Sequence, residues 1–354
     1  MLDFKVKSSV HDYEVKFIEN VPDIIKNEIH MGDVIIIDNN VKNLYPDLLK
    51  DISDDNCIIC LDAHEHQKSY QGLVPILDKL INRGFRKNHR LIGIGGGIIQ
   101  DITAFTASIM YRGVKWIFFP TTLLAQGDSC IGSKTSINFG EFKNQIGGFY
   151  PPNKIYINTD FLRTLCESDL QSGLGEMSHF FVVSGENDFK QFKMNYENGL
   201  KDKSVLATMI SKSLKIKKNY IEMDEFDQRE RQIFNYGHSF GHAIESLSDY
   251  KVPHGIAVSF GMDMANYISV KRNHLSDAVR FEIRELLEKI CRGYHIKNMD
   301  VTKFALALSK DKKNVGKELR LILCKGYGKV FKTAQNLDDE FIGWLEDYFK
   351  YELN

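Results

Sequence analysis

The sequence has little of what marks disulfide-stabilised, membrane or nucleic-acid-binding proteins. Six cysteines are scattered over 354 residues, which argues against a disulfide framework. No apolar run reaches the roughly 18 residues that a membrane-spanning helix requires, and the N-terminus lacks the apolar core of a signal peptide. Basic residues (46) balance acidic ones (47), so no basic surface for nucleic acid is indicated. We therefore expect a cytoplasmic globular protein with no membrane or nucleic-acid partner.

The first 165 residues alternate short apolar runs with segments of helical periodicity. The runs predicted as strands, each buried on both faces, are Val34–Asp38, Ile58–Leu61, Leu91–Gly95, Trp116–Pro120 and Ile155–Ile157. Between them, residues 72–85 and 98–112 carry the three-to-four spacing of helices. This alternation predicts an α/β domain over residues 1–165, with a mostly parallel sheet covered by helices on both sides.

The second half of the chain has a different texture. Long helical patterns dominate from about Ser168 to Val301, and β-branched runs are few. Residues 319–324 and 329–332, separated by Gly326-Tyr327-Gly328, resemble a late hairpin. The simplest interpretation is a second, mainly α-helical domain over residues 166–354.

A triple glycine, Gly95-Gly96-Gly97, follows one predicted strand and begins a helix. Glycines let the backbone approach a ligand closely, and the free N–H groups of a helix N-terminus favour a phosphate. The spacing is not that of the dinucleotide G-x-G-x-x-G motif, because Ile98 occupies the last glycine position. Phosphate binding is the favoured interpretation, and close packing is the alternative. Asp38, at the end of an earlier strand, could accept hydrogen bonds from a ribose.

A polar loop is predicted after the strand that ends at Pro120. It includes Asp128, Lys134 and Lys143, and it follows a buried strand, where open α/β sheets bind ligands. Lysine offers a point charge to a phosphate or carboxylate. A single lysine more often only solvates a surface, so the hypothesis depends on the glycine turn and on the metal ligands described next.

Two histidines and a glutamate in the second half suggest a metal site. His238 and His254 lie in glycine-flanked segments, and Glu176 lies upstream in Ser172-Gly173-Leu174-Gly175-Glu176. Imidazole nitrogens with one carboxylate leave coordination positions open, which is typical of a catalytic metal. His242 follows His238 by one helical turn. Spacing alone leaves it open whether His242 is a ligand, a supporting group or a core histidine.

Taken jointly and in this order, these segments resemble the 3-dehydroquinate synthases within the wider sugar phosphate cyclase family. The resemblance covers about Asp38 to Lys313. It is carried by Gly95-Gly96-Gly97-x-x-x-Asp101, Tyr111-Arg112-Gly113, Pro120-Thr121-Thr122-Leu123-Leu124-Ala125-Gln126, Ser133-Lys134-Thr135, Lys143-Asn144, Ser172-Gly173-Leu174, Asn235-Tyr236-Gly237-His238 and Asp311-Lys312-Lys313.

The resemblance implies a Rossmann-like NAD-binding domain followed by a mainly α-helical metal-binding domain. It implies NAD and Zn²⁺ or Co²⁺ as cofactors, a sugar phosphate as substrate, and a homodimer. The implied reaction belongs to aromatic amino-acid biosynthesis. It eliminates phosphate from a seven-carbon keto-acid phosphate and closes the ring by an intramolecular aldol step, so the enzyme would be a carbon–oxygen lyase.

The resemblance also implies roles for individual residues. The implied metal ligands are Glu176, His238 and His254, which gives His242 to the phosphate side. The implied NAD-binding positions are Asp38, Asn40, Glu65, Lys68, Gly96, Gly97, Asp101, Thr121, Thr122, Thr164 and Leu165. The implied substrate positions are Asp128, Lys134, Lys143, Asn144, Lys217, Arg231, Asn235 and His242. Arg112 would reach the phosphate bound to the neighbouring subunit, and either Lys312 or Lys313 would join the phosphate site.

The chain departs from the family pattern at one substrate-side position. Dehydroquinate synthases carry a lysine three residues after the ligand glutamate, and this chain has His179 there. The milder change is Ser133, where many relatives have glycine. Arg231 and Asn235 favour a carboxylated substrate, whereas His179 leaves the substrate open.

Three alternatives follow. They are a cyclase that makes a cyclitol from a non-carboxylated sugar phosphate, a metal-dependent NAD alcohol dehydrogenase, and a non-enzymatic NAD-binding protein. The complete set of candidate residues argues against the last of these.

Overall fold

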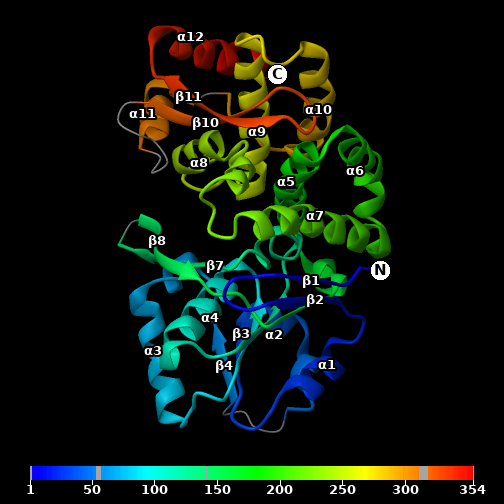
Figure 1. Ribbon diagram of the computed structural model, residues 1–354, viewed down its shortest axis with the longest axis vertical. Coiled ribbons are helices and arrows are strands. Elements are labelled where there is room, and N and C mark those ends of the chain that lie inside the picture. The colour runs from blue at the N-terminus through cyan, green and yellow to red at the C-terminus, as the bar shows by residue number, and fades with distance from the viewer. Residues whose placement is uncertain (1, 53–56, 141, 298, 311–317, 354) are drawn as a thin grey trace. The chain divides into compact units, whose positions relative to one another are not determined.

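The computed structural model describes residues 2–52, 57–140, 142–297, 299–310 and 318–353 (Figure 1). The chain divides into two compact units, Met1–Leu165 with Asp202–Phe226, and Cys166–Lys201 with Asp227–Asn354. The sequence-based division at residue 165 counts residues 202–226 with the second domain, whereas their contacts place them in the first unit. In helix α7 (Lys203–Met223), Ser213 Oγ donates to the carbonyl oxygen of Gly127 at 2.9 Å.

The first unit contains a seven-stranded sheet with the order β1-β2-β9-β6-β5-β3-β4. Its strands are β1 (Phe4–Val6), β2 (Tyr13–Phe17), β3 (Val34–Asp38), β4 (Ile58–Leu61), β5 (Leu91–Gly95), β6 (Trp116–Pro120) and β9 (Lys154–Ile157). β1 and β2 pair antiparallel, and the other neighbouring strands pair parallel. The predicted α/β domain with a mostly parallel sheet is therefore confirmed, and so are its five predicted strands.

Burial within the sheet follows strand position. The central strands β5 and β6 are buried along their whole length, as expected for parallel strands covered on both faces. Strand β4 was also predicted to be buried on both faces, but three of its four residues are partly exposed. The reason is that β4 forms the edge of the sheet.

The described helices of the first unit are α1 (Val21–Glu28), α2 (Asn39–Leu44), α3 (Tyr70–Asn82), α4 (Gly97–Ile109) and α7. Helix α3 begins earlier than predicted because the side chain of Ser69 accepts a hydrogen bond from the amide of Gly72 and caps the helix. Helix α4 ends at Ile109, earlier than predicted, because Met110 is extended, with ψ of 122°, and Tyr111 after it adopts a left-handed conformation with φ of 50°.

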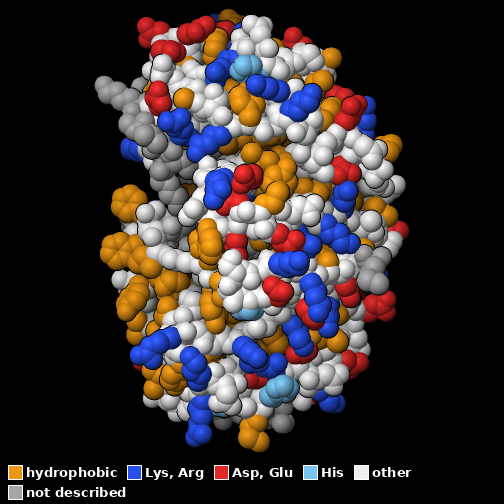
Figure 2. All heavy atoms as spheres, viewed as in Figure 1, with side chains coloured by type: hydrophobic (Ala, Val, Ile, Leu, Met, Phe, Trp, Pro, Cys, Tyr) orange, Lys and Arg blue, Asp and Glu red, His pale blue; other side chains and the backbone are white. Residues whose placement is uncertain are grey.

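The polar loop predicted after Pro120 instead contains a β-hairpin. Strands β7 (Lys134–Phe139) and β8 (Phe142–Phe149) pair antiparallel. The side chains of Phe139 and Phe142 are 61% and 68% exposed, and Figure 2 shows hydrophobic side chains gathered at this edge of the first unit. Sequence reasoning missed the hairpin because β8 is exposed along most of its length and lacks an apolar run.

The second unit is mainly helical, as predicted. Its helices are α5 (Glu167–Ser184), α6 (Glu186–Gly199), α8 (His238–Leu247), α9 (His254–Lys271), α10 (Asp277–Ile290), α11 (Val301–Ser309) and α12 (Asp339–Asp347). The predicted hairpin is also present, as β10 (Glu318–Cys324) paired with β11 (Val330–Asn336). Helix α9 is central to the unit: it contacts α5, α8, α10 and β10, and nearly all of it is buried. Among the described residues, none of the helices has both the length and the apolar character that crossing a membrane requires.

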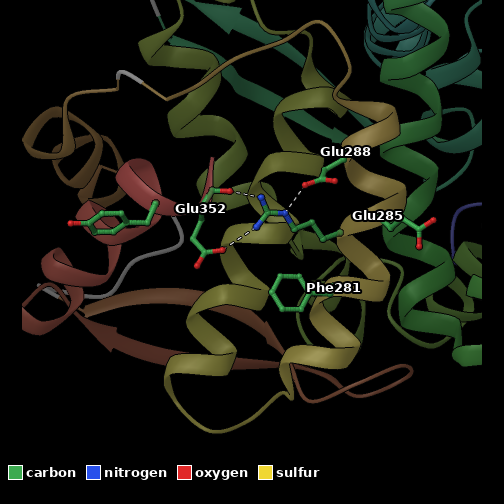
Figure 3. A pocket seen from close by; sticks show the side chains of 6 residues that line it. Phe281, Glu285, Glu288 and Glu352 are labelled. Carbon is green, nitrogen blue, oxygen red and sulfur yellow. Dashed lines mark hydrogen bonds and ion pairs between the residues drawn. The ribbon is translucent and has the colours of Figure 1, made fainter. Parts of the chain in front are cut away.

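A pocket in the second unit lies between helix α10 and the C-terminal residues Tyr351 and Glu352. Its lining consists of Phe281, Arg284, Glu285, Glu288, Tyr351 and Glu352 (Figure 3). Arg284 lies between two carboxylates: its Nε is 2.8 Å from Glu288 Oε1 and its Nη1 is 3.0 Å from Glu352 Oε2. The side chain of Arg284 therefore ties the C-terminal turn, residues 348–352, to helix α10.

Candidate metal centre and cofactor-binding site

The structure brings the three proposed metal ligands together from three helices of the second unit. Glu176 lies in α5, and His238 and His254 are the first residues of α8 and α9. Glu176 Oε1 is 3.3 Å from His238 Nε2, and Glu176 Oε2 is 3.4 Å from His254 Nε2. The three ligand atoms all lie within 4.8 Å of one another. One divalent ion can therefore contact all three side chains after small adjustments.

Glycines at the helix crossings make this convergence possible. A Cβ atom on Gly255, next to His254, would lie 1.8 Å from the carbonyl oxygen of Ser172 in α5. A Cβ on Gly175, next to Glu176, would lie 2.3 Å from the carbonyl oxygen of Gly255. The backbones of α5 and α9 thus touch where both helices carry a ligand, and any side chain there would separate the ligands.

Hydrogen bonds on the far sides of the two imidazoles determine where their protons lie. His254 Nδ1 is 3.0 Å from Glu245 Oε2, and His238 Nδ1 is 3.3 Å from the carbonyl oxygen of Tyr236. Both partners only accept hydrogen bonds, so each Nδ1 carries the proton. When the imidazoles are neutral, both Nε2 lone pairs then face the carboxylate of Glu176. Such a set of converging lone pairs fits a bound cation, and two histidines with one carboxylate suit zinc.

The pKa shifts show that the buried carboxylates of this centre favour positive charge beside them. Burial opposes ionisation of Glu176, but His238, His179 and His254 together hold its pKa well below the ordinary value. Burial also opposes protonation of His254, yet Glu176 and Glu245 raise its pKa well above the ordinary value. Burial lowers the pKa of His238. A proton on His254 and a metal ion are therefore alternative ways of placing positive charge among these carboxylates.

Glu245 is the residue of this centre that sequence reasoning missed. His242, Glu245 and His254 form a second group whose ligand atoms lie within 4.8 Å of one another. The ring of His242 is 5.8 Å from that of His254 and inclined by 26° to it. The available signal was helical spacing, since Glu245 follows His238 by seven residues and His242 by three, on one face of α8.

His179 contacts the carboxylate of Glu176. Its side chain is 1% exposed, and its Nε2 is 3.3 Å from Glu176 Oε1. Its ring lies 3.9 Å from that of Phe180 and 5.8 Å from that of Phe234, measured between centroids. The position expected to face the substrate thus contacts a candidate metal ligand and an aromatic wall formed by Phe180 and Phe234.

In the first unit, proposed NAD-binding residues lie at the carboxyl ends of neighbouring parallel strands. Asp38 ends β3, and its side chain accepts from the amide of Asn40 at 2.9 Å. Gly96 follows β5 and caps α4. A Cβ on Gly96 would lie 2.8 Å from Thr122 Cγ2, whereas a Cβ on Gly97 would meet nothing within 4 Å. An open helix N-terminus beside a strand-end carboxylate fits the phosphates and ribose of a dinucleotide.

Other proposed NAD-side residues are joined to the framework of the first unit. Lys68 Nζ is 2.6 Å from Asp101 Oδ2, and Asp101 Oδ1 accepts from the amide of Ser136 at 3.1 Å. Glu65 Oε1 accepts from Asn138 Nδ2 at 2.7 Å. These contacts link the start of α3 and helix α4 to strand β7. Burial raises the pKa of Asp101.

The remaining NAD-side residues lie at strand and turn ends of the same unit. The amide of Thr121 donates to the carbonyl oxygen of Gly95 at 3.0 Å. Thr164 Oγ1 lies 2.9 Å from the hydroxyl of Tyr45, and the amide of Leu165 donates to the carbonyl oxygen of Leu162 at 3.3 Å.

The proposed substrate residues of the first unit gather around the hairpin and α7. Lys217 Nζ is 2.8 Å from Asp128 Oδ1. Lys134, Lys143 and Asn144 are exposed on β7 and β8, and Asn144 Oδ1 accepts from Ser136 Oγ at 2.9 Å. Arg112 is exposed and has a left-handed backbone with φ of 63°.

The proposed substrate residues of the second unit flank the start of α8. Arg231 is 5% exposed and lies with Asn235 in the 3-10 turn Glu230–Asn235. Asn235 Nδ2 donates to the carbonyl oxygen of Gln232 at 2.9 Å. His242 lies one turn into α8. Lys312 and Lys313 lie outside the described residues.

Comparison with known proteins identifies the family. The N-terminal family model of 3-dehydroquinate synthase matches residues 58–172, and the C-terminal model matches residues 173–314. The 3-dehydroquinate synthase of Helicobacter pylori (strain P12) is 36% identical over 329 residues, 92% of this chain and 93% of that protein. That of Dictyoglomus thermophilum is 36% identical and covers 94% of this chain and 92% of its own length.

Solved structures of two cyclases have the same fold. A 2-deoxy-scyllo-inosose synthase in complex with carbaglucose-6-phosphate, NAD⁺ and Co²⁺ aligns with a TM-score of 0.81 and 20% identity, over 98% of this chain and 99% of that one. A 2-epi-5-epi-valiolone synthase from Streptomyces hygroscopicus with NAD⁺ and Zn²⁺ bound gives 0.83 and 22%, over 94% and 95%. By the match of both family models and the identity to its relatives, the chain belongs to the 3-dehydroquinate synthase family.

Proposed function

We propose that this protein is a sugar phosphate cyclase of the 3-dehydroquinate synthase type that uses NAD and a divalent metal, Zn²⁺ or Co²⁺. It would act as a carbon–oxygen lyase, releasing inorganic phosphate and closing a ring by an intramolecular aldol reaction. Family membership supports the reaction class. The metal dependence is supported by the convergence of Glu176, His238 and His254. The Nδ1 atoms of the two histidines bond to Glu245 and to the carbonyl oxygen of Tyr236, which leaves each Nε2 for the metal.

The two cofactors would supply the chemistry that side chains lack, since a divalent metal polarises substrate hydroxyls and NAD reversibly accepts a hydride. The chain's own residues would bind the substrate and manage its charge. Lys134, Lys143 and His242 are proposed to stabilise the departing phosphate dianion, an electrostatic contribution often worth several kcal/mol. The carboxylate of Asp128 is proposed to hold Lys217 in place through their 2.8 Å ion pair.

For the substrate, we favour the seven-carbon keto-acid phosphate. Arg231 supports this choice because a guanidinium can grip a carboxylate with two parallel hydrogen bonds, and this side chain is buried and close in sequence to the metal ligand His238. A neutral sugar phosphate is the second candidate, and it is favoured by one observation: His179 stands where the dehydroquinate synthases carry lysine.

We also propose a homodimer in which Arg112 reaches the phosphate bound to the neighbouring subunit. The exposure of Arg112 supports this role. Sedimentation of the purified protein tests the assembly. Mixing an Arg112→Ala variant with a variant inactivated at the metal centre tests the shared site, because one competent site should re-form in the mixed dimer. A monomer, or no recovery on mixing, would contradict the proposal.

The decisive assay compares three substrates with zinc-loaded, NAD-loaded protein. The seven-carbon keto-acid phosphate, sedoheptulose 7-phosphate and glucose 6-phosphate are incubated separately. Inorganic phosphate, NADH and the carbon product are then followed. We expect phosphate release from the keto-acid phosphate, a cyclic product and no lasting NADH. Sustained NADH without phosphate would instead identify a dehydrogenase.

A further inference from the structure

We propose that His179 is a positioning residue that holds one oxygen of Glu176, so that the other oxygen is the one offered to the metal. This inference rests on the proposed metal centre and extends it to a residue that sequence reasoning placed toward the substrate. It assigns the histidine at this position to the support of the metal ligand and not to contact with the substrate.

His179 is buried against the carboxylate of Glu176. It follows Glu176 by one turn of α5, with 1% of its side chain exposed, and its Nε2 is 3.3 Å from Glu176 Oε1. The rings of Phe180 and Phe234 pack near its ring, at 3.9 and 5.8 Å between centroids. An imidazole enclosed in this way is directed at the ligand carboxylate.

The hydrogen-bond partners of the histidine nitrogens decide which nitrogen of His179 carries its proton. An ionised carboxylate only accepts hydrogen bonds, so a histidine nitrogen that bonds to it must carry a proton. In their neutral, metal-binding forms, His238 and His254 carry the proton on Nδ1, toward the carbonyl oxygen of Tyr236 and the carboxylate of Glu245. His179 Nδ1 is buried and has no hydrogen-bond partner among the described residues. The single proton of a neutral His179 therefore belongs on Nε2, where it donates to Glu176 Oε1.

The two oxygens of Glu176 consequently become unequal. With His254 neutral, Oε1 receives the N–H of His179, whereas Oε2 accepts no hydrogen bond from the described residues and lies 3.4 Å from His254 Nε2. The unengaged oxygen is the one beside the second histidine ligand. Holding Oε1 favours binding of the metal through one oxygen, as expected when a supporting hydrogen bond orients a ligand.

The test measures metal binding without substrate. His179→Phe keeps a planar ring and removes the N–H, His179→Gln restores an amide N–H, and His295→Phe is the matched control at an exposed histidine of the same unit. We expect His179→Phe to weaken zinc binding by about 10–100-fold in chelator competition. His179→Gln should recover most of the affinity, and His295→Phe should match the wild type.

The Co²⁺-loaded proteins provide a spectroscopic readout. We expect the visible bands of His179→Phe to weaken, because a released carboxylate can bind through both oxygens and raise the coordination number. Circular dichroism and NAD affinity report on folding. If His179→Phe fails to fold, His179→Gln and His179→Met, unbranched side chains with and without an N–H, decide the same question.

Wild-type zinc affinity and an unchanged Co²⁺ spectrum in His179→Phe would overturn the inference, whether or not the KM for a phosphorylated substrate is raised. A raised KM in that case would make His179 a substrate contact. Because zinc affinity and the Co²⁺ spectrum are measured without substrate, a wild-type protein that releases no phosphate would defeat the cyclase proposal and leave this one standing.

Discussion

Glu245 accepts a hydrogen bond from His254: the carboxylate oxygen Oε2 lies 3.0 Å from Nδ1 of the imidazole. The two residues belong to adjacent helices, α8 and α9. The contact fixes both the tautomer and the ring orientation of a candidate metal ligand, as carboxylates commonly do behind metal-bound histidines.

Replacing Glu245 by glutamine should therefore weaken zinc binding by about 10–100-fold while the fold is kept. Chelator competition measures the affinity, and Glu340→Gln, at an exposed position of the same unit, is the control. Equal zinc affinities of Glu245→Gln and the wild type would show that the contact does not support a ligand.

Arg231→Ala should impair a carboxylated substrate far more than a neutral one. Loss of a bidentate pair to a carboxylate should lower kcat/KM about 100-fold or more, equivalent to roughly 2.7 kcal/mol. The comparison is between the keto-acid phosphate and sedoheptulose 7-phosphate, with the same enzyme preparation. Equal losses with both substrates would remove the carboxylate role.

Lys68→Met should destabilise the first unit by about 3–5 kcal/mol, because it leaves the carboxylate of Asp101 without a cationic partner in a largely buried position. The ion pair is 2.6 Å long, and the two side chains are 9% and 19% exposed. Urea unfolding measures the change. Adding Asp101→Leu should restore part of the stability, and an additive further loss would show that the two residues are not coupled.

Stability in acid should depend on Glu28, which accepts hydrogen bonds from Lys154 Nζ at 2.6 Å and the hydroxyl of Tyr156 at 2.5 Å. Burial opposes ionisation, but these hydrogen bonds and nearby positive charges hold the pKa of Glu28 below its ordinary 4.5. A depressed native pKa contributes stability above the unfolded-state value, and this is lost as the pH falls through the native value.

We therefore expect Glu28→Gln to lose less unfolding free energy than the wild type between about pH 5 and pH 3. Urea unfolding at several pH values in this window measures the two slopes. Parallel slopes for the two proteins would contradict the assignment.

The central strands could be predicted from sequence because burial on both faces produces uninterrupted apolar runs, as in Val34–Asp38 and Trp116–Pro120. The exposed strand Phe142–Phe149 could not, because its residues carry no such run. Helix Lys203–Met223 reads as part of the second domain in chain order, and only its tertiary contacts place it in the first unit.

The candidate site divides in the same way. Glu176, His238 and His254 could be proposed because their chemistry is visible in residue types. The contacts of Glu245 and His179 could not, since they depend on how α8 and α5 lie against the ligands. Nor could the pairing of Lys68 with Asp101, which joins segments that are distant in the sequence.

The most direct test of the account is anomalous X-ray diffraction from zinc-loaded crystals of the wild type and His254→Ala. The account predicts one zinc ion bound to Nε2 of His238, Nε2 of His254 and a carboxylate oxygen of Glu176 at about 2.0–2.2 Å. That peak should be absent from His254→Ala, which should still bind NAD. Zinc held by other residues, or stoichiometric zinc with full activity in His254→Ala, would contradict it.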